Sequence, residues 1–240
     1  TVAHNIDGAF NDSLTNIEGI KGSTTASNTL IGNNMNNTLI GGNQTDTIKG
    51  VSGNNSLSGG AGNDTIFAGT GSDIIDGGAG NDDWLYYTDL DLASTNVSVN
   101  LRNNTATYGS STDSITAIEH LKMGNGTNTV QGNSYANSFI GGTGTDTLSY
   151  SEAASGVTVN VTSAGAGTSS GDGADVFTGF ENYTLSSNAD TANLSGVFGS
   201  TIDGGALSDT ASYSSVAASL TVTVDSGNTS ARVSDGTKTD

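Results

Sequence analysis

The sequence predicts an all-β solenoid, a chain wound into stacked coils of about 18 residues. Seven blocks of nine residues follow one another without a gap from residue 23 to residue 85. The eighth place of every block is apolar, which chance rarely produces in a chain that is 33% hydrophobic. Proline, which would interrupt a continuous ladder of backbone hydrogen bonds, is absent.

Each block combines a turn with a short strand. The opening glycines tolerate positive φ and the close approach of a second backbone, so we expect a turn there. The Thr or Ser and the aliphatic residue that follow favour a strand. Nine residues cannot enclose a core, so two blocks should form one coil, and coils should stack at about 4.8 Å. The eighth places are the expected core: Leu30, Leu39, Ile48, Leu57, Ile66, Ile75 and Trp84.

Three blocks carry the clearest motif: Gly-Gly-Asn-Gln-Thr-Asp-Thr-Ile-Lys at 41–49, Gly-Gly-Ala-Gly-Asn-Asp-Thr-Ile-Phe at 59–67 and Gly-Gly-Ala-Gly-Asn-Asp-Asp-Trp-Leu at 77–85. They resemble the calcium-binding nonapeptide repeats of the RTX family, Gly-Gly-x-Gly-x-Asp-x-apolar-x. Two blocks match at every defined place, and the first departs only at Gln44. The resemblance implies a right-handed parallel β-roll with Ca²⁺ between successive turns on the same edge.

Blocks two apart should share an edge of such a roll, so the sixth place of each block should stack on the sixth place two blocks later. Stacked carboxylates about 4.8 Å apart repel by several kcal/mol at an intermediate dielectric constant unless a cation separates them. Ca²⁺ takes six to eight oxygen ligands. The plainer alternative is that these aspartates are solvated turn residues. One edge would carry Asn28, Asp46, Asp64 and Asp82, and the other Asn37, Asn55, Asp73 and Asp91.

The family's ligand pattern, carried over by position, gives two calcium sites on the first edge. The earlier turn would contribute its aspartate and the carbonyls of its second and fourth places. The later turn would contribute its aspartate and the carbonyls of its first and third places. The first site would consist of Gly42, Gln44, Asp46, Gly59, Ala61 and Asp64. The second site would consist of Gly60, Gly62, Asp64, Gly77, Ala79 and Asp82.

Weaker metal candidates lie elsewhere. Asp73 could face Asn55 or Asp91 on the second edge. Asn28 on the first edge and Asn37 on the second would form amide ladders without metal. Asp146 belongs to a further glycine turn and would pair with Asn128 as half a site. Asp190 and Asp209 are spaced one place too far apart for two blocks, so they are interpreted as out of register.

A longer repeat overlies the nonapeptides. Gly-Gly recurs at 77–78, 141–142 and 204–205, followed by a tyrosine, an alternating strand, an acidic turn and an apolar residue before Glu. Residues 146–160 match a stretch common in large bacterial RTX proteins. We expect an ending unit at 1–22, the nonapeptide roll at 23–85, irregular strands with nonapeptides at 86–140, a second unit at 141–203 and the start of a third at 204–240. The acids that recur beside these units, Asp12, Asp113, Asp175 and Asp240, are interpreted as turn caps.

The two ends of the sequence also repeat one another. Residues 1–12 align with residues 229–240 at five of twelve places. A solenoid needs capped ends. We therefore expect either a slice of a longer array or a subunit that stacks end to end.

Composition excludes several classes of protein. The net charge of −18 disfavours nucleic-acid binding, and the lack of cysteine excludes disulfides and thiolate metal sites. No apolar run approaches the length of about 18 residues that a transmembrane helix needs. The RTX resemblance implies export through a type I channel and folding in external calcium. It therefore implies a secreted protein at a bacterial cell surface.

No catalytic set is apparent, and we do not expect an enzyme. The only histidines, His4 and His120, lie far apart, and no Gly-x-Ser-x-Gly elbow is followed by a plausible base. Trp84 and the tyrosines could stack on sugars, but core packing is the favoured interpretation of Trp84.

Three functions remain open at this point. The first is a calcium-stiffened structural rod in a surface layer (S-layer), filament or adhesin, with end-to-end or side-by-side self-association. The second is the calcium-binding export and folding region of a type I secreted enzyme or toxin whose catalytic domain lies outside this chain. The third is a recognition module with a glycan or cell-surface partner.

Overall fold

The computed structural model describes residues 3–6, 10–13, 16–89, 95–163, 165–195, 199–216, 221–224 and 231–234. These residues form strands and turns, and no helix among them is long and apolar enough to cross a membrane. The chain divides into two compact units, Thr1–Asn128 with Gly142–Gly144, and Thr129–Gly141 with Thr145–Asp240. Asp91, a predicted member of the second edge, lies outside the described residues.

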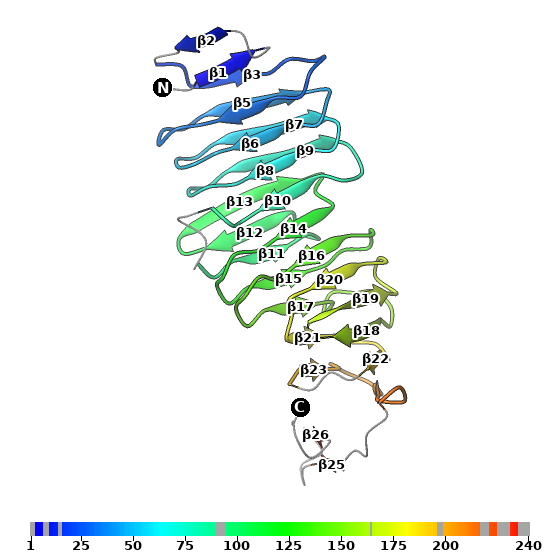
Figure 1. Cartoon of the computed structure of the whole chain (residues 1–240). Coiled ribbons are helices and arrows are strands. Elements are labelled where there is room, and N and C mark those ends of the chain that lie inside the picture. The colour runs from blue at the N-terminus through cyan, green and yellow to red at the C-terminus, as the bar shows by residue number, and fades with distance from the viewer. Residues whose placement is uncertain are drawn as a thin grey trace. The chain divides into compact units, whose positions relative to one another are not determined.

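Two sheets build the coils of the first unit (Figure 1). One sheet contains, in spatial order, β4 (Thr29–Ile31), β6 (Thr47–Lys49), β8 (Thr65–Phe67), β10 (Trp84–Tyr86) and β14 (His120–Lys122). The other contains β3 (Gly19–Lys21), β5 (Thr38–Gly42), β7 (Ser56–Ala61), β9 (Ile74–Ala79), β13 (Ser111–Thr116), β12 (Thr105–Tyr108) and β11 (Ser98–Asn100). A hairpin of β1 (Ala3–Ile6) and β2 (Phe10–Ser13) precedes them.

The second unit repeats this construction. One set of strands runs β16 (Ser138–Ile140), β20 (Val176–Thr178), β19 (Ala166–Ser170), β18 (Thr158–Ser163), β22 (Thr191–Leu194) and β24 (Thr210–Ser212). The other runs β15 (Thr129–Gln131), β17 (Thr147–Ser149), β21 (Asn182–Thr184) and β23 (Thr201–Asp203). A hairpin of β25 (Thr221–Val224) and β26 (Ala231–Ser234) follows.

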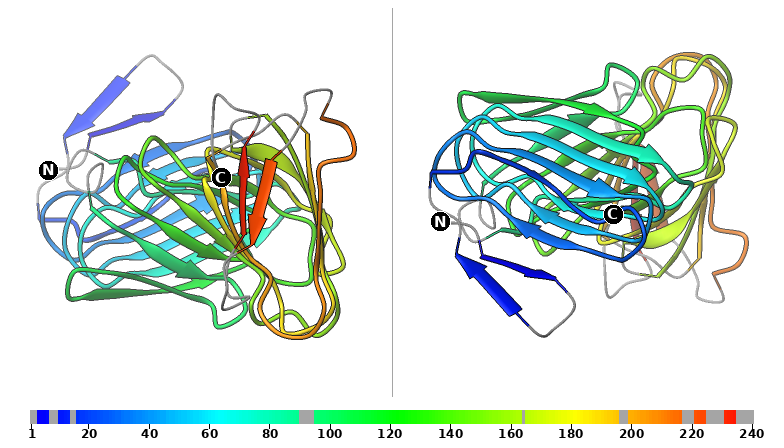
Figure 2. Two further views of the ribbon diagram at one scale, coloured as in Figure 1. Left: turned by 90° about the horizontal axis from the view of Figure 1, so that it is seen from below. Right: turned by 90° about the horizontal axis from the view of Figure 1, so that it is seen from above.

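The predicted register, in which each coil spans two blocks, holds through the nonapeptides of the first unit. Parallel pairing places Leu39 beside Leu57 and then Ile75 in one sheet, and Ile48 beside Ile66 in the other. Successive coils therefore overlie one another, as the view from above shows for the blue-to-cyan strands (Figure 2). The six aliphatic side chains at the eighth places fill the interior at 0–1% exposure: Leu30, Leu39, Ile48, Leu57, Ile66 and Ile75.

Trp84 does not belong to this core, so that prediction is wrong. The coil from β8 to β10 is longer than two nonapeptides by a single residue, because Trp84 pairs with Thr65 and Leu85 pairs with Ile66. The extra residue moves every later side chain of the strand to the opposite face. Leu85 is therefore fully buried, whereas Trp84 lies half-buried on the outer face against the His120 and Tyr86 rings.

Antiparallel strands interrupt the parallel coils in both units. In the first unit β12 pairs antiparallel with β11 and β13, and in the second β19 pairs antiparallel with β18 and β20. The sequence predicted these segments as irregular solenoid strands, and two extra strands per unit account for the irregularity. The parallel ladder resumes after each insertion, with β13 against β9 and β18 against β22.

Two adjacent isoleucines test the assignment of the core. Ile75→Ala should lower the free energy of unfolding by about 2–5 kcal/mol, because it removes a fully buried side chain between two sheets. Ile74→Ala is the matched control, since Ile74 is 63% exposed on the same strand, and should change stability by less than about 0.5 kcal/mol. Urea unfolding in saturating calcium measures both. Equal losses for the two variants would contradict the register.

Candidate metal centre

A ladder of acidic side chains runs along one edge of the first unit. Each carboxylate accepts a hydrogen bond from the backbone N–H of the equivalent residue one coil earlier. The Asn28 N–H donates to Asp46 Oδ1 at 2.6 Å, the Asp46 N–H to Asp64 Oδ1 at 2.7 Å, and the Asp64 N–H to Asp83 Oδ1 at 2.7 Å. These aspartates are 0–1% exposed, so they are not solvated turn residues.

The second oxygen of each carboxylate is the feature that points to a cation. Oδ2 of Asp46, Asp64 and Asp83 is buried and has no hydrogen-bond partner among the described residues. Two unit charges about 5 Å apart repel by about 3 kcal/mol at an effective dielectric constant of about 20. A buried, charged and unpartnered oxygen is costly unless a cation or a proton neutralises it.

Main-chain carbonyls lie beside these oxygens. A side-chain carbon added at Gly41 would collide with both Asp46 Oδ2 and the Gly59 carbonyl. One added at Gly59 would collide with both Asp64 Oδ2 and the Gly77 carbonyl. Each carboxylate of the earlier turn therefore borders the same small space as the first-place carbonyl of the later turn. The predicted pairs, Asp46 with the Gly59 carbonyl and Asp64 with the Gly77 carbonyl, therefore lie close together, and their role as calcium ligands stays a prediction.

The other predicted carbonyls stack in columns through the turns. Gly60 lies against the Gly42 carbonyl and Gly62 against the Gln44 carbonyl, so the second and fourth places of the two turns lie over one another. Gly60 and Gly62 have φ of 108° and 121°, which L side chains rarely adopt. Ala61 pairs with Ala79, whose carbonyl accepts a hydrogen bond from the Gly62 N–H at 3.0 Å.

The chemistry of this donor set fits Ca²⁺. No group of three or more His, Asp or Glu side chains converges on one point in the described parts of the chain. A cation between two turns would therefore take much of its coordination from backbone carbonyls. Carboxylate and carbonyl oxygens in a tolerant geometry are the ligands that Ca²⁺ prefers.

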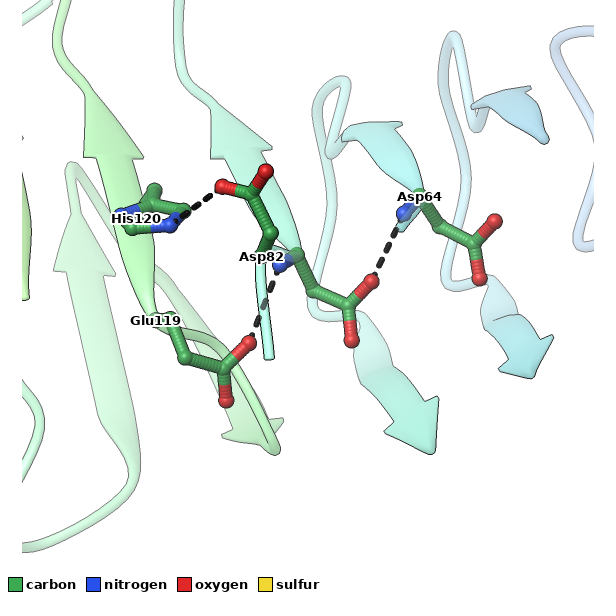
Figure 3. Close-up of polar contacts among 5 residues, drawn as sticks. Asp64, Asp82, Glu119 and His120 are labelled. Carbon is green, nitrogen blue, oxygen red and sulfur yellow. Dashed lines mark hydrogen bonds and ion pairs between the residues drawn. The ribbon is translucent and has the colours of Figure 1, made fainter. Parts of the chain in front are cut away.

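Asp82 is not part of the ladder, which corrects the predicted register. Asp83 takes the rung above Asp64, because this coil contains the extra residue that also displaces Trp84. The Asp82 side chain is 55% exposed, and its Oδ1 lies 2.6 Å from His120 Nε2 (Figure 3). The structure therefore places Asp83 in the position that the second predicted site assigned to Asp82.

The second edge has a ladder of its own, and it ends differently. The Asn55 N–H donates to Asp73 Oδ1 at 2.6 Å, and the Asp73 N–H donates to Asp113 Oδ1 at 2.8 Å. Asp73 Oδ2 is buried without a partner in the described chain, but both oxygens of Asp113 accept tyrosine hydroxyls. Tyr87 donates to Oδ2 at 2.8 Å, and the Tyr108 hydroxyl has two acceptors within reach, the Gly71 carbonyl at 2.7 Å and Asp113 Oδ1 at 3.1 Å.

Asp113 and Asp175 are therefore buried anchors rather than simple turn caps. In the second unit Asp175 accepts hydrogen bonds from the Tyr150 hydroxyl at 2.7 Å and the Ser169 hydroxyl at 2.9 Å. Its Oδ1 also accepts the Asn137 N–H. The recurrence of Tyr and Asp in the long unit was visible in the sequence, but nothing in a single sequence pairs residues so far apart.

The second unit contains the remaining predicted aspartates. Asp146 is fully buried, and its N–H donates to Glu181 Oε2 at 2.9 Å. The Asp190 N–H donates to Asp209 Oδ1 at 2.9 Å, because β22 and β24 pair with the same one-residue offset as these two aspartates. The interpretation of Asp190 and Asp209 as out of register is therefore wrong. Leu207 stands in place of the turn glycine and adopts a positive φ of 70°.

Burial sets the protonation of the ladder. It raises the pKa of Asp64 to about 6 from 3.8; the Asp46 N–H counters this, and the charges of Asp83 and Asp46 add to it. Burial likewise raises the pKa of Asp73 to about 7 and that of Asp83 above its usual range. Without a cation, these carboxylates tend to take up protons.

The sequence was compared with known families. The model of the RTX calcium-binding nonapeptide repeat, in four copies, matches residues 23–57, 49–83 and 124–152. The chain carries RTX repeats. The matched segments contain the ladder from Asn28 to Asp83 and also Asp146. RTX repeats bind Ca²⁺ and occur in type I secreted proteins, which indicates an extracellular location. No curated protein sequence matches the chain at a significant level.

The shared carboxylate of Asp64 gives the first test of the RTX site. Asp64→Asn should weaken the binding of two calcium ions at once, each by at least about tenfold, because ligand charge sets calcium affinity. Asparagine already occupies equivalent rungs at Asn37 and Asn55, so the fold should persist. Asp82→Asn is the control, and calcium calorimetry is the measurement. Loss of binding in the control alone would restore the register based on Asp82.

The raised pKa values give a second test. Calcium binds the charged carboxylates, so its affinity should fall as the pH drops through about 7 and then about 6, the pKa values of Asp73 and Asp64. Calcium calorimetry across this pH range measures the trend, and a pH-independent affinity would contradict it.

Proposed function

We propose that the chain is an extracellular, calcium-stiffened β-roll with a structural role at a bacterial cell surface, in a surface layer, a filament or an adhesin stalk. It has no catalytic activity of its own in this proposal. Calcium converts an acidic, glycine-rich chain into a stack of coils that resists bending. Such coils would associate end to end or side by side in the assembled material.

The observation that carries the proposal is the repetition of the same rung in successive coils. From Asn28 to Asp83 each coil offers one carboxylate to the coil before it, and three of these carboxylates have an unpartnered oxygen in the described structure. The interior between the sheets is narrow, with one aliphatic side chain per strand in the nonapeptide coils. Calcium linking each pair of turns would supply cohesion that so narrow a core does not provide.

The outer surface supports a structural role rather than catalysis. His120 is the one histidine whose side chain is described, and it pairs with Asp82 and stacks on Trp84. The Tyr86 ring packs edge-on against both the Phe67 and the Trp84 rings. The Phe67–Tyr86 and Trp84–His120 contacts join β10 to its neighbours β8 and β14, and such cross-strand contacts stabilise a sheet.

A second function is favoured by the family match. RTX repeats occur in type I secreted proteins, so the chain could serve as the calcium-binding export and folding region of a secreted enzyme or toxin. The catalytic domain would then lie outside this chain. The two functions share the calcium-dependent fold and differ in whether the folded chain assembles.

Chelation and microscopy test the proposal together. Circular dichroism should change from β structure to a largely disordered spectrum when calcium is removed, because the unneutralised carboxylates repel and little apolar surface compensates. Electron microscopy in calcium should then show fibres or lattices. Single particles with a calcium-dependent spectrum would favour the export and folding region. A spectrum that chelation leaves unchanged would contradict both functions.

A further inference from the structure

The acidic ladders of both units end on a glutamate that belongs to no nonapeptide. The Asp83 N–H donates to Glu119 Oε2 at 3.0 Å, and the Asp146 N–H donates to Glu181 Oε2 at 2.9 Å. Figure 3 follows the first ladder from Asp64 to Glu119. Each glutamate therefore makes the contact that the next aspartate would make in a regular RTX coil.

The backbone around the two glutamates is the same in both units. The Asp83 carbonyl accepts the N–H groups of both Glu119 and His120, at 3.3 and 3.0 Å. The Asp146 carbonyl likewise accepts those of Glu181 and Asn182, at 3.1 and 3.0 Å. A geometry that recurs in a separate unit, at the equivalent point of the long repeat, is a built feature of that repeat.

A carbonyl accompanies each glutamate, as in the calcium turns. The Ala117 carbonyl lies where a side chain at Gly77 would project, and the Gly179 carbonyl lies where one at Gly141 would project. In a regular coil the carbonyl at this position comes from the first residue of the next glycine turn. The Gly59 carbonyl, for example, lies where a side chain at Gly41 would project. Ala117 and Gly179 both have positive φ, 50° and 74°, which turns the chain sharply just before the glutamate.

Side-chain length explains why glutamate stands there. In a nonapeptide turn the carbonyl and the carboxylate belong to the first and sixth places of the block, as for Gly59 and Asp64. In the short turn they are only two places apart, as for Ala117 and Glu119. The side chain of glutamate is longer than that of aspartate by one methylene group. This extra length lets the Glu119 and Glu181 carboxylates accept the backbone N–H groups of Asp83 and Asp146 from the shorter turn.

Asp83 shows that this position needs a cation. It is fully buried, its Oδ1 is used by the Asp64 N–H, and its Oδ2 has no hydrogen-bond partner in the described chain. The charges of Glu119, Asp82 and Asp76 all act on it. A buried carboxylate with an unpartnered oxygen, beside a second carboxylate and a main-chain carbonyl, offers the oxygen ligands that Ca²⁺ prefers.

We propose that Glu119 and Glu181 are calcium ligands that close the ladders of the two units. One Ca²⁺ would bind between Asp83 and Glu119 with the Ala117 carbonyl, and another between Asp146 and Glu181 with the Gly179 carbonyl. The recurring apolar-Glu pair of the long repeat thus extends calcium binding beyond the nonapeptides. The proposal rests on calcium binding by the regular turns.

Glutamine variants test the two sites by calcium calorimetry on the full chain with calcium chloride. Glu119→Gln and Glu181→Gln should each lose one ion or weaken one ion by at least about tenfold, and the double variant should lose both. Glutamine Oε1 can still accept the backbone N–H, so the circular dichroism spectrum in saturating calcium should not change. Glu152→Gln removes an exposed carboxylate that takes no part in either proposed site and should bind calcium as the parent protein does.

The outcomes separate this inference from the proposed function. If the parent protein binds calcium but both glutamine variants match it in stoichiometry and affinity, the glutamates are not ligands. If the parent protein binds no calcium, the proposed function fails as well. Anomalous scattering from parent crystals grown in calcium chloride decides the matter if a variant does not fold. Ions should then lie about 2.3–2.6 Å from Glu119 and Glu181 oxygens, and their absence there would overturn the proposal.

Discussion

The hydrogen bond from a backbone N–H to the aspartate of the next coil sets the spacing of the whole ladder. It uses one carboxylate oxygen and leaves the other buried, as at Asp46, Asp64 and Asp83. The stacking that brings this contact about therefore buries a carboxylate oxygen for which the described residues provide no hydrogen-bond partner. This connects the fold to its ion, because coils can stack closely only where something neutralises the row of carboxylates.

The two edges of the first unit solve this problem in different ways. Along the first edge, carboxylates stand beside main-chain carbonyls, which suits a divalent cation. At the end of the second edge, Asp113 accepts the Tyr87 hydroxyl and lies within hydrogen-bond distance of the Tyr108 hydroxyl, so both of its oxygens have protein partners. Asp175 with Tyr150 and Ser169 repeats this arrangement in the second unit. Tyrosine hydroxyls therefore partner a buried aspartate beside the antiparallel strands of each unit.

Periodicity predicted the regular part of the molecule well. Six aliphatic eighth places, the two-block register and the stacking of Asp46 on Asp64 follow from the nonapeptide repeat alone. The error began at one residue. A second aspartate after Asp82 lengthens the coil, and side-chain alternation then exchanges Trp84 for Leu85 in the core and Asp82 for Asp83 on the ladder. A sequence repeat predicts which side chains point into the core only while each coil has the same number of residues. A single inserted residue moves the following side chains of the strand to the opposite face.

The contacts that the sequence did not predict are those between residues far apart along the chain, such as Glu119 with Asp83 and Tyr87 with Asp113. An inserted pair of antiparallel strands separates the partners along the chain. The residue at which the parallel coil continues after these strands depends on strand pairing in the folded protein and not on the local sequence. Glutamate in place of aspartate also hides the equivalence of the rungs, because the shorter turn needs the longer side chain.

Hydrogen exchange at the rung amides tests most directly whether calcium holds the ladder together. The N–H groups of Asn28, Asp46 and Asp64 each donate to the next carboxylate, so their exchange reports whether that contact is closed. With saturating calcium they should exchange as slowly as the amides of the buried strands. On chelation they should lose protection together. Protection that is unchanged without calcium would show that the ladder needs no cation and would contradict the account.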